Sequence, residues 1–347
     1  MKSKDNSKKS HAEVKELQEK IKQLKSKTFK TMEGGNFASK SWNWYRNKKK
    51  ISDLDKQVPK SFGEVVKSWF STIFGAILVV MILNGILIAS FVVPTGSMEN
   101  TVMTGDFLFV NKFLYGPSTP QVIPFLNIPL PFYKTPGIKD PKQGDVIVFI
   151  FPGNRDEEKS KEFQYYLKRC VATAGDTIQV INKRVFVNGV EFGLPEHGRY
   201  EPFQRETQYD KFRTFPVGAG FTPNNYGPLK IPKKGDEITL NPQNWRQWEM
   251  FIKREGHTMT FDGTNVIIDS KPTTKYNVLR NYCFGMGDNR DNSLDSRFFG
   301  FIPFENVVGT PMIVYMSLPD KDEFERPYTL FERILHMRFE RIGKIIL

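Results

Sequence analysis

Three short segments of this chain carry residue types that could do chemistry. Ser97 lies between Gly96 and Met98 just after a long apolar run, Lys168 lies in the segment QYYLKRCV, and residues 287–296 read GDNRDNSLDS. A serine hydroxyl is a weak nucleophile until a neighbouring base takes its proton. The first question is therefore which residue could serve Ser97 as a base.

Histidine is a poor candidate for that base. His11 and His336 lie close to the two ends of the chain, and His197 and His257 lie in a loop-rich segment where nothing nearby suggests a nucleophile. The chain also has no HExxH sequence of the kind that binds catalytic zinc. The remaining base type is lysine, although Lys168 taken alone reads as an ordinary solvated strand residue.

The acidic segment 287–296 suggests a calcium loop but does not fit one. Counted from Asp288, the third position of an EF-hand loop is Arg290, and counted from Asp291, the sixth position is Ser296 instead of glycine. We therefore expect no metal at this segment.

An uncharged apolar stretch of 25 residues, Trp69 to Val93, precedes Ser97. An α-helix needs about 20 apolar residues to cross the hydrocarbon of a bilayer, and a buried core helix is rarely apolar on every face for this length. The sequence predicts a transmembrane helix over 69–93. Its position is too late for an ordinary cleaved signal peptide, so we interpret it as a retained signal anchor.

The charge distribution gives this anchor an orientation. Residues 1–68 hold 18 Lys and Arg against 8 Asp and Glu, and the remaining chain carries only +2 of the total net charge of +12. The positive-inside rule places residues 1–68, a basic arm with a short amphipathic helix over 11–27, in the cytoplasm and residues 94–347 outside it. The net charge therefore does not indicate a nucleic-acid partner.

After the apolar stretch, short alternating runs dominate the sequence. Four of them, FLFV, VIVF, TIQV and EITL, follow Gly-Asp pairs, which are typical of turns that lead into strands. No 10–15-residue helical patterns alternate with these runs, so we expect a mainly β, antiparallel protein. We expect its catalytic domain over 94–183 and 277–320, with an inserted second β-rich domain over 184–276.

Three other features of the sequence leave alternatives open. Residues 321–347 have near-helical apolar spacing and predict a C-terminal amphipathic helix, either on the outer leaflet or packed on the β domain. The Pro-rich segment 117–143 predicts an irregular loop. Cys170 and Cys283 form no metal motif, and either one disulfide or two buried thiols would fit them.

Five blocks of sequence resemble one known family, the bacterial type I signal peptidases, or leader peptidases, which remove signal peptides from exported proteins. The resemblance leaves 1–64, 117–140 and most of 184–276 unmatched. The blocks, in chain order, are VVPTGSM at 92–98, GDFLFVNKFLYG at 105–116, PKQGDVIVF at 141–149, YLKRCVATAGD at 166–176 and GDNRDNSLDSRFFGFIP at 287–303.

The resemblance implies a Ser-Lys dyad, with Ser97 as nucleophile and Lys168 as general base. Burial among apolar groups would lower the pKa of this lysine from about 10.4 and make it an effective base. Two further hydroxyls are implied, Thr95 beside the Ser97 N–H at the oxyanion, and Ser293 orienting the lysine. The implied supporting residues are Asp288, Asp295 and Arg297. One departure is Asn100, where the family commonly has proline.

The same resemblance implies the substrates and the surroundings of the enzyme. The substrates are signal peptides of secreted preproteins, cleaved after small residues of the Ala-x-Ala type, and no cofactor or metal is implied. The implied pocket residues are Phe91, Val93, Val102, Tyr166 and Leu167. The expected location is the bacterial cytoplasmic membrane, in contact with the lipid bilayer, with the catalytic domain on the periplasmic side; an indirect association with the secretion translocon is left open.

Two other interpretations compete with this one. A self-cleaving repressor-type Ser-Lys protease would need a DNA-binding domain, which the sequence does not indicate. A catalytically inactive homologue, acting as a membrane-anchored binding or assembly protein, would not need Ser97, Lys168 and Ser293, all of which are present. We therefore expect an active signal peptidase.

Overall fold

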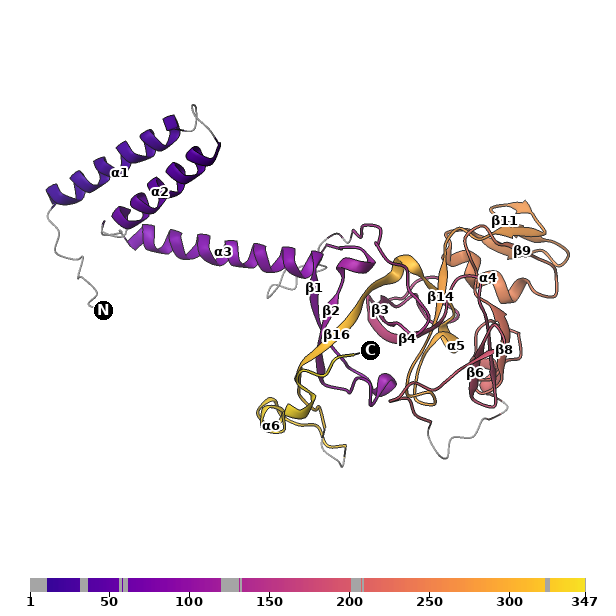
Figure 1. Cartoon of the computed structure of the whole chain (residues 1–347). Helices are drawn as coiled ribbons and strands as arrows, with labels where there is room; N and C mark the ends of the chain where they lie inside the picture. Colours follow the sequence, from indigo (N-terminus) through magenta and orange to yellow (C-terminus); the bar gives the residue numbers. More distant parts are fainter. Residues whose placement is uncertain are drawn as a thin grey trace. The chain divides into compact units, whose positions relative to one another are not determined.

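The computed structural model describes residues 11–31, 37–55, 58, 62–119, 131, 133–200, 207, 209–321 and 325–346 (Figure 1). The chain divides into two compact units, Met1–Leu78 and Val79–Leu347. Residues 120–130 and 132 of the Pro-rich segment 117–143 lie outside the described residues.

The first unit is helical. It contains α1 (His11–Thr31), α2 (Phe37–Asp55) and most of α3 (Phe62–Ile86), and α1 and α2 contact each other (Figure 1). The amphipathic helix expected over 11–27 is present as α1, whose surface carries a Glu16–Lys20 pair at the stabilising i,i+4 spacing. The basic segment 41–50 also lies in a helix, α2.

Helix α3 contains the candidate membrane span, Val65–Leu83, which is long and apolar enough to cross a bilayer. The prediction that the helix continues to Val93 is wrong, because α3 ends at Ile86 and residues Ile88–Val92 form strand β1. This strand pairs with β2 (Asp106–Asn111), and its exposed and half-buried residues alternate. Apolar composition alone does not separate the end of a helix from a strand that follows it.

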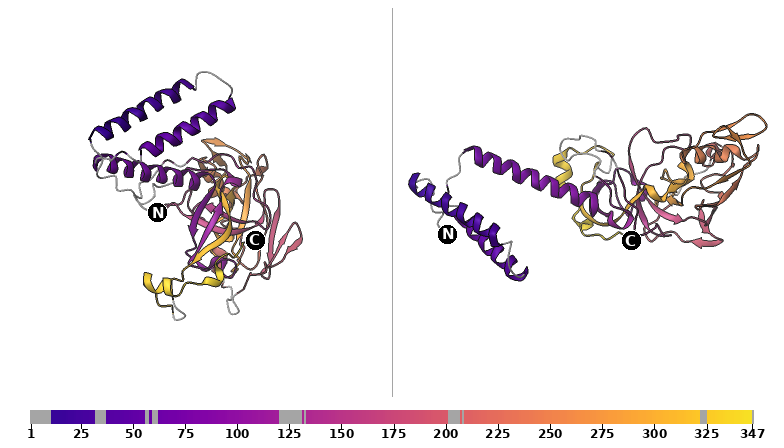
Figure 2. Two further views of the ribbon diagram at one scale, coloured as in Figure 1. Left: turned by 60° about the vertical axis from the view of Figure 1, so that its left-hand side comes forward. Right: turned by 90° about the horizontal axis from the view of Figure 1, so that it is seen from above.

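The larger unit is built on a seven-stranded sheet in the order β1-β2-β16-β3-β4-β14-β15, and each described strand pair in it is antiparallel. Strand β16 (Val307–Ser317), gold in Figures 1 and 2, lies between β2 and β3. The other strands are β3 (Val146–Ile150), β4 (Tyr165–Ala172), β14 (Tyr282–Met286) and β15 (Ile302–Pro303). The expected mainly β, antiparallel architecture is confirmed.

A second sheet belongs to the loop-rich insertion. It has four strands in the order β7-β6-β5-β8, and β5 pairs with β6 as an antiparallel hairpin. The boundary expected at residue 184 would divide this hairpin. The insertion therefore begins earlier, at the start of β5. The strands are β5 (Thr177–Ile181), β6 (Arg184–Val187), β7 (Val190–Phe192) and β8 (Tyr226–Lys230).

The insertion shares its hydrophobic core with the seven-stranded sheet. Val171 of β4 and Phe284 of β14 belong to the same buried cluster as Ile178 and Phe251 of the insertion. The remaining elements of the insertion are α4 (Trp245–Arg254), β9 (Glu237–Thr239), β10 (Met259–Phe261), β11 (Val266–Ile268), β12 (Lys271–Pro272) and β13 (Lys275–Asn277).

The helix expected over 321–347 is much shorter than predicted. In the described part of this segment, α6 covers only Leu330–Leu335, a 3-10 turn covers Phe339–Arg341, and the chain then pairs with β16 through a bridge from Ile345 to Ile313. Gly343, at φ +88°, accompanies this change of direction. Helical spacing does not distinguish a long amphipathic helix from a helical turn followed by an extended tail.

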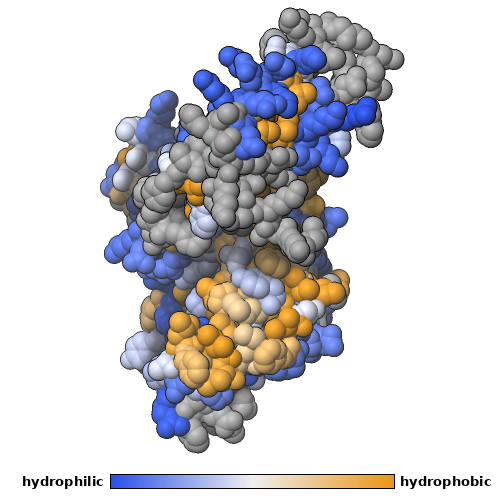
Figure 3. All heavy atoms as spheres, turned by 90° about the vertical axis from the view of Figure 1, so that its left-hand side faces the viewer, coloured by the Kyte–Doolittle hydropathy of each residue, from blue (hydrophilic) through white to orange (hydrophobic). Residues whose placement is uncertain are grey.

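The C-terminal segment nevertheless exposes apolar side chains. Figure 3 shows apolar residues gathered in the lower half of the view, and α6 lies in the lower part of Figure 1. The exposed apolar residues of this segment are Leu330, Phe331, Ile334, Leu335, Phe339, Ile342 and Ile345. Most of this segment's apolar surface therefore does not contribute to the core of the β domain.

A buried carboxylate connects the insertion to the main sheet. Glu255, at the end of α4, accepts hydrogen bonds from the hydroxyls of Tyr276 at 2.5 Å and Tyr282 at 2.7 Å, and from the Leu279 N–H. Tyr282 belongs to β14 of the main sheet. Buried hydroxyls and amides that lose an acceptor cost free energy.

We expect Glu255→Ala to lower the free energy of unfolding by about 3 kcal/mol, because three donors lose one buried acceptor. Thermal unfolding of the full chain in detergent should show a melting temperature lower by roughly 6–12 °C. The control is Glu249→Ala, which removes only a partly exposed i,i+4 pair with Lys253 and should have little effect. Equal melting temperatures for the two variants would contradict this account.

Candidate active site

Ser97 lies in a short 3-10 turn, Gly96–Met98, between β1 and β2. Thr95 precedes the turn in an extended conformation, and the Ser97 carbonyl oxygen accepts the N–H of Asn289 at 3.1 Å. The first N–H groups of a helical turn have no acceptor within that turn. The turn therefore presents both the Ser97 hydroxyl and backbone donors at the same place.

Lys168 comes from β4, and its side chain reaches Ser97. Its Nζ lies 2.7 Å from Ser97 Oγ and donates to the Leu167 carbonyl oxygen at 3.0 Å. The residue is only 3% exposed. Burial lowers the pKa of Lys168 to about 8, although the charges of Asp295 and Asp288 act in the opposite direction. A neutral amine at this distance can accept the hydroxyl proton.

Two glycines let β14 and the residues after it approach this pair. A Cβ atom on Gly287 would lie 2.5 Å from the Ser97 carbonyl oxygen and 2.3 Å from Ser293 Oγ. A Cβ atom on Gly285 would lie 3.0 Å from Lys168 Cβ. Side chains at these positions would displace the nucleophile or the base.

The structure places Ser293 beside the site but not in the expected bond. Ser293 Oγ is buried and has no hydrogen-bond partner among the described residues, and the bonds described for Lys168 Nζ go to Ser97 and Leu167. The expectation that Ser293 bonds the lysine is therefore not met in this structure. Its hydroxyl can rotate, and it remains close enough to Gly287 to prevent substitution there.

Asp295 and Arg297 form the expected ion pair, fully buried. Arg297 donates from Nε to Asp295 Oδ1 at 2.9 Å and from Nη2 to Oδ2 at 2.8 Å. Asp295 also accepts the Gly287 N–H and the Arg297 N–H, so this pair holds the strand end to α5 (Ser296–Phe299).

Asp288 has a partner that the sequence analysis missed. Arg169 donates from Nε and Nη2 to its two carboxylate oxygens, at 2.9 and 2.8 Å, and Thr101 donates to Oδ2 at 2.6 Å. A buried carboxylate requires such partners, and this requirement was the only signal available. Arg169, which follows Lys168 in the chain, therefore holds Asp288 in position.

The carboxylates of the acidic segment 287–296 form ion pairs with Arg and Lys side chains of the chain itself. Arg169 pairs with Asp288, Lys183 with Asp291, and Arg297 with Asp295. Within the described residues no group of three or more His, Cys, Asp or Glu side chains could hold a metal ion. Cys170 and Cys283 are both buried and not bridged to each other.

Thr95 lies at the entrance of the site, where its Oγ1 is 3.5 Å from Ser97 Oγ. A long contact of this kind leaves the hydroxyl able to turn toward a developing oxyanion. Asn100 occupies the left-handed region with φ +73°, which is closed to proline. The turn after Ser97 therefore has a conformation that the usual proline could not adopt.

A cavity of about 550 Å³ opens beside Ser97 and Lys168. Four of the five expected pocket residues line it, whereas Val102 is fully buried in the core behind Met98. Val102 is thus not a wall residue. Phe91 and Tyr165 meet edge to face across this region, with ring centroids 4.8 Å apart. The main apolar lining residues are Phe91, Val93, Met98, Leu108, Val148, Tyr165, Tyr166 and Leu167.

The model of the family described as "Signal peptidase, peptidase S26" matches residues 66–316, which is more than half of the chain. The chain belongs to this family. It is 31% identical over 318 residues to the signal peptidase I of Buchnera aphidicola subsp. Schizaphis graminum, covering 87% of this chain and 90% of that one.

The chain is also similar to other signal peptidases I. The signal peptidase I of Helicobacter pylori strain J99 is 30% identical over 267 residues, covering 75% of this chain and 86% of that protein. A crystal structure of a signal peptidase I from Enterococcus faecalis matches 50% of this chain and 97% of that chain, with a TM-score of 0.22 and 20% identity.

The lysine predicts the pH dependence of this peptidase. Lys168 accepts a proton only when neutral, and its pKa is lowered to about 8, so kcat/KM should rise with pH and level off above about 8. The measurement is a pH profile on a peptide substrate without titratable groups near the cleaved bond. A limb centred near 10 would show that Lys168 is not desolvated.

The close approach of Gly287 predicts a severe effect of a single methyl group. We expect Gly287→Ala to lower kcat/KM at least about 100-fold, because the new Cβ would push against the Ser97 carbonyl and Ser293. Gly193→Ala is the matched control, since a Cβ atom there would meet nothing within 4 Å. Similar activity of the two variants would refute the role of this contact.

Proposed function

We propose that this chain is a membrane-anchored endopeptidase that removes signal peptides from exported preproteins, with Ser97 as nucleophile and Lys168 as general base. The observation that carries the proposal is the 2.7 Å contact between Ser97 Oγ and the buried Lys168 Nζ, at the edge of an apolar cavity. The S26 family match and the signal peptidase I relatives support the same reaction.

The reaction follows from these positions. Lys168 Nζ takes the hydroxyl proton while Ser97 Oγ bonds to the scissile carbonyl carbon, and the carbonyl electron pair moves to oxygen. The Ser97 N–H and the Thr95 hydroxyl stabilise this oxyanion. Lys168 then gives its proton to the leaving amine as the C–N bond breaks. Lys168 Nζ, now neutral again, takes a proton from water as the water oxygen bonds to the acyl carbon. The bond from that carbon to Ser97 Oγ then breaks, and Lys168 returns the proton to Oγ.

Lys168 can perform both proton transfers because its surroundings balance its charge. Burial disfavours the ammonium form, and the nearby carboxylates Asp288 and Asp295 partly offset this effect. The lowered pKa, about 8, leaves an amine that accepts and returns a proton near neutral pH. Arg169 and Arg297 keep the two carboxylates paired, so neither of them needs the lysine as its ion-pair partner.

The cavity favours an extended substrate with small side chains. β14 pairs with β4 only over Arg169–Ala172, so the facing edge of β4 over 165–167 has no described strand partner. β1 is the outer strand of the sheet. A peptide that adds to these edges would place alternate side chains into the apolar wall, as in other cases of strand addition. Tyr166, Leu167 and Met98 belong to this wall.

The anchor and the orientation are part of this proposal. α3 holds a segment apolar enough to span a bilayer, and 18 Lys and Arg precede its end on the N-terminal side against 8 Asp and Glu. By the positive-inside rule, residues 1–68 lie in the cytoplasm and the cavity outside it. The enzyme then meets preproteins at the surface where their signal peptides leave the bilayer.

The dyad predicts that Ser97→Ala and Lys168→Ala each lower preprotein cleavage by about 1000-fold or more, because they remove the nucleophile or its base. The assay is processing of an Ala-x-Ala preprotein by the detergent-solubilised chain. Lys142→Ala, at an exposed lysine of the same domain, serves as the control and should cleave at the unmodified rate. Cleavage at that rate by either dyad variant would rule out the proposed mechanism.

A further inference from the structure

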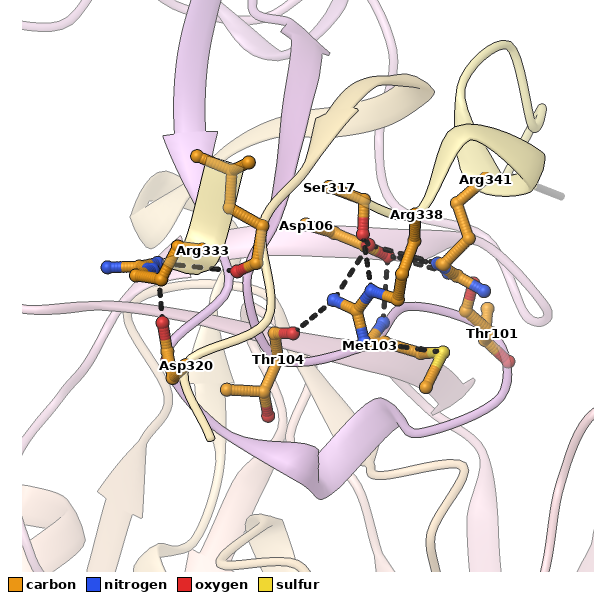
Figure 4. Close-up of polar contacts among 10 residues, drawn as sticks. Thr101, Met103, Thr104, Asp106, Ser317, Asp320, Arg333, Arg338 and Arg341 are labelled. Atoms are coloured by element: carbon orange, nitrogen blue, oxygen red, sulfur yellow. Dashed lines mark hydrogen bonds and ion pairs between the residues drawn. The ribbon is translucent and has the colours of Figure 1, made fainter. Parts of the chain in front are cut away.

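A second polar cluster lies behind the nucleophile turn and involves the end of the chain. Asp106, the first residue of β2, is fully buried. Its carboxylate accepts the Met103 N–H at 2.9 Å, the Ser317 hydroxyl at 2.7 Å, and Arg341 through Nε and Nη2, the latter at 2.6 Å (Figure 4). The reaction described above does not use any of these groups.

Three cations of the C-terminal segment also bind the backbone that follows Ser97. Arg338 donates to the Thr104 carbonyl at 2.6 Å, Arg341 to the Thr101 carbonyl at 3.4 Å, and Lys344 to the Asn100 carbonyl at 3.0 Å (Figure 4 for the two arginines). We call these three residues the C-terminal latch. Carbonyl groups in a loop need such donors, because no strand or helix supplies them there.

The segment held by the latch, residues 99–105, contains backbone conformations that its surroundings must maintain. At its far end, Gly105 has φ +84°, and a Cβ atom on it would lie 2.0 Å from the Leu318 carbonyl oxygen. Near its start, Asn100 is in the left-handed region. Such conformations persist when the surroundings determine them.

The same segment is connected to the reacting groups. Val102 N–H donates to the Met98 carbonyl at 2.8 Å, and the Thr101 hydroxyl donates to Asp288, whose own N–H lies 3.3 Å from Met98 Sδ. Met98 directly follows Ser97 and is buried. A displacement of residues 99–105 would therefore reach Ser97 within a few bonds.

We propose that Arg338, Arg341 and Lys344 are positioning residues for the nucleophile. They hold residues 99–105 and thereby keep the Ser97 hydroxyl in contact with Lys168 Nζ. This inference rests on the proposed Ser97–Lys168 reaction and adds the end of the chain to the machinery. The latch touches neither Ser97 nor Lys168 directly; it acts through the backbone between Met98 and Asp106.

The test compares variants within the C-terminal segment. Arg341→Ala removes the main partner of Asp106, and Arg338→Ala removes a side chain that is 20% exposed and leaves a smaller gap. The matched control is Arg333→Ala, an arginine of α6 that pairs with Asp320 and the Leu318 carbonyl instead (Figure 4). All variants are prepared as the full chain in detergent, with melting curves to establish folding.

We expect Arg341→Ala and Arg338→Ala to lower kcat/KM at neutral pH by about 10- to 100-fold, because small displacements of a nucleophile have effects of this size. The acid limb of the pH profile should also move upward by on the order of one pH unit, since a loosened turn admits water to Lys168. The charged groups near the lysine, namely Asp288, Asp295 and Arg297, are unchanged in these variants.

The shift of the limb separates positioning from a loss of folded protein, which would scale the whole profile without moving it. Arg333→Ala should keep both the rate and the limb. If folded Arg338→Ala retains the unmodified limb, the latch does not position the nucleophile, even if Arg341→Ala fails to fold. Absence of cleavage by the unmodified chain would instead overturn the proposed function itself.

Discussion

The site depends on keeping one lysine out of water. Lys168 is useful as a base only in its neutral form, and the fold supplies this by surrounding its amine with β4, the Ser97 turn and the glycines of the 285–287 segment. Desolvation is costly, and it is compatible with folding because each neighbouring carboxylate has its own arginine. Because the carboxylates are paired with arginines, burial outweighs their effect on Lys168, and the pKa of its amine stays lowered, at about 8.

The residues of the candidate site could be predicted from the sequence, whereas many of their contacts could not. Ser97, Lys168, Asp288, Asp295 and Arg297 lie in short blocks of specific sequence, so the blocks could be recognised as similar to those of a known family. The structure brings these blocks together, and the Ser97–Lys168 contact agrees with the expectation. The roles of Thr95 and Ser293 remain predictions, and Ser293 makes no bond to the lysine here.

What the sequence could not supply were pairings between distant segments. Arg169 with Asp288, and Asp106 with Arg341, are partnerships over more than a hundred residues that no periodicity reveals. The same limit explains the errors at both ends of the β domain. The apolar run to Val93 satisfies a helix and a strand equally, and Arg338 and Arg341 look like the polar face of a helix until Asp106 is seen beneath them.

The strand order has a consequence for when this enzyme becomes active. Ser97 follows β1 and precedes β2, whereas Lys168 lies on β4. Among the described strands, β16, which begins at residue 307, joins these two parts of the sheet. Such long-range pairing is slow to form. The sheet that holds the nucleophile turn beside its base is therefore complete only after β16 has been made and has paired with β2 and β3.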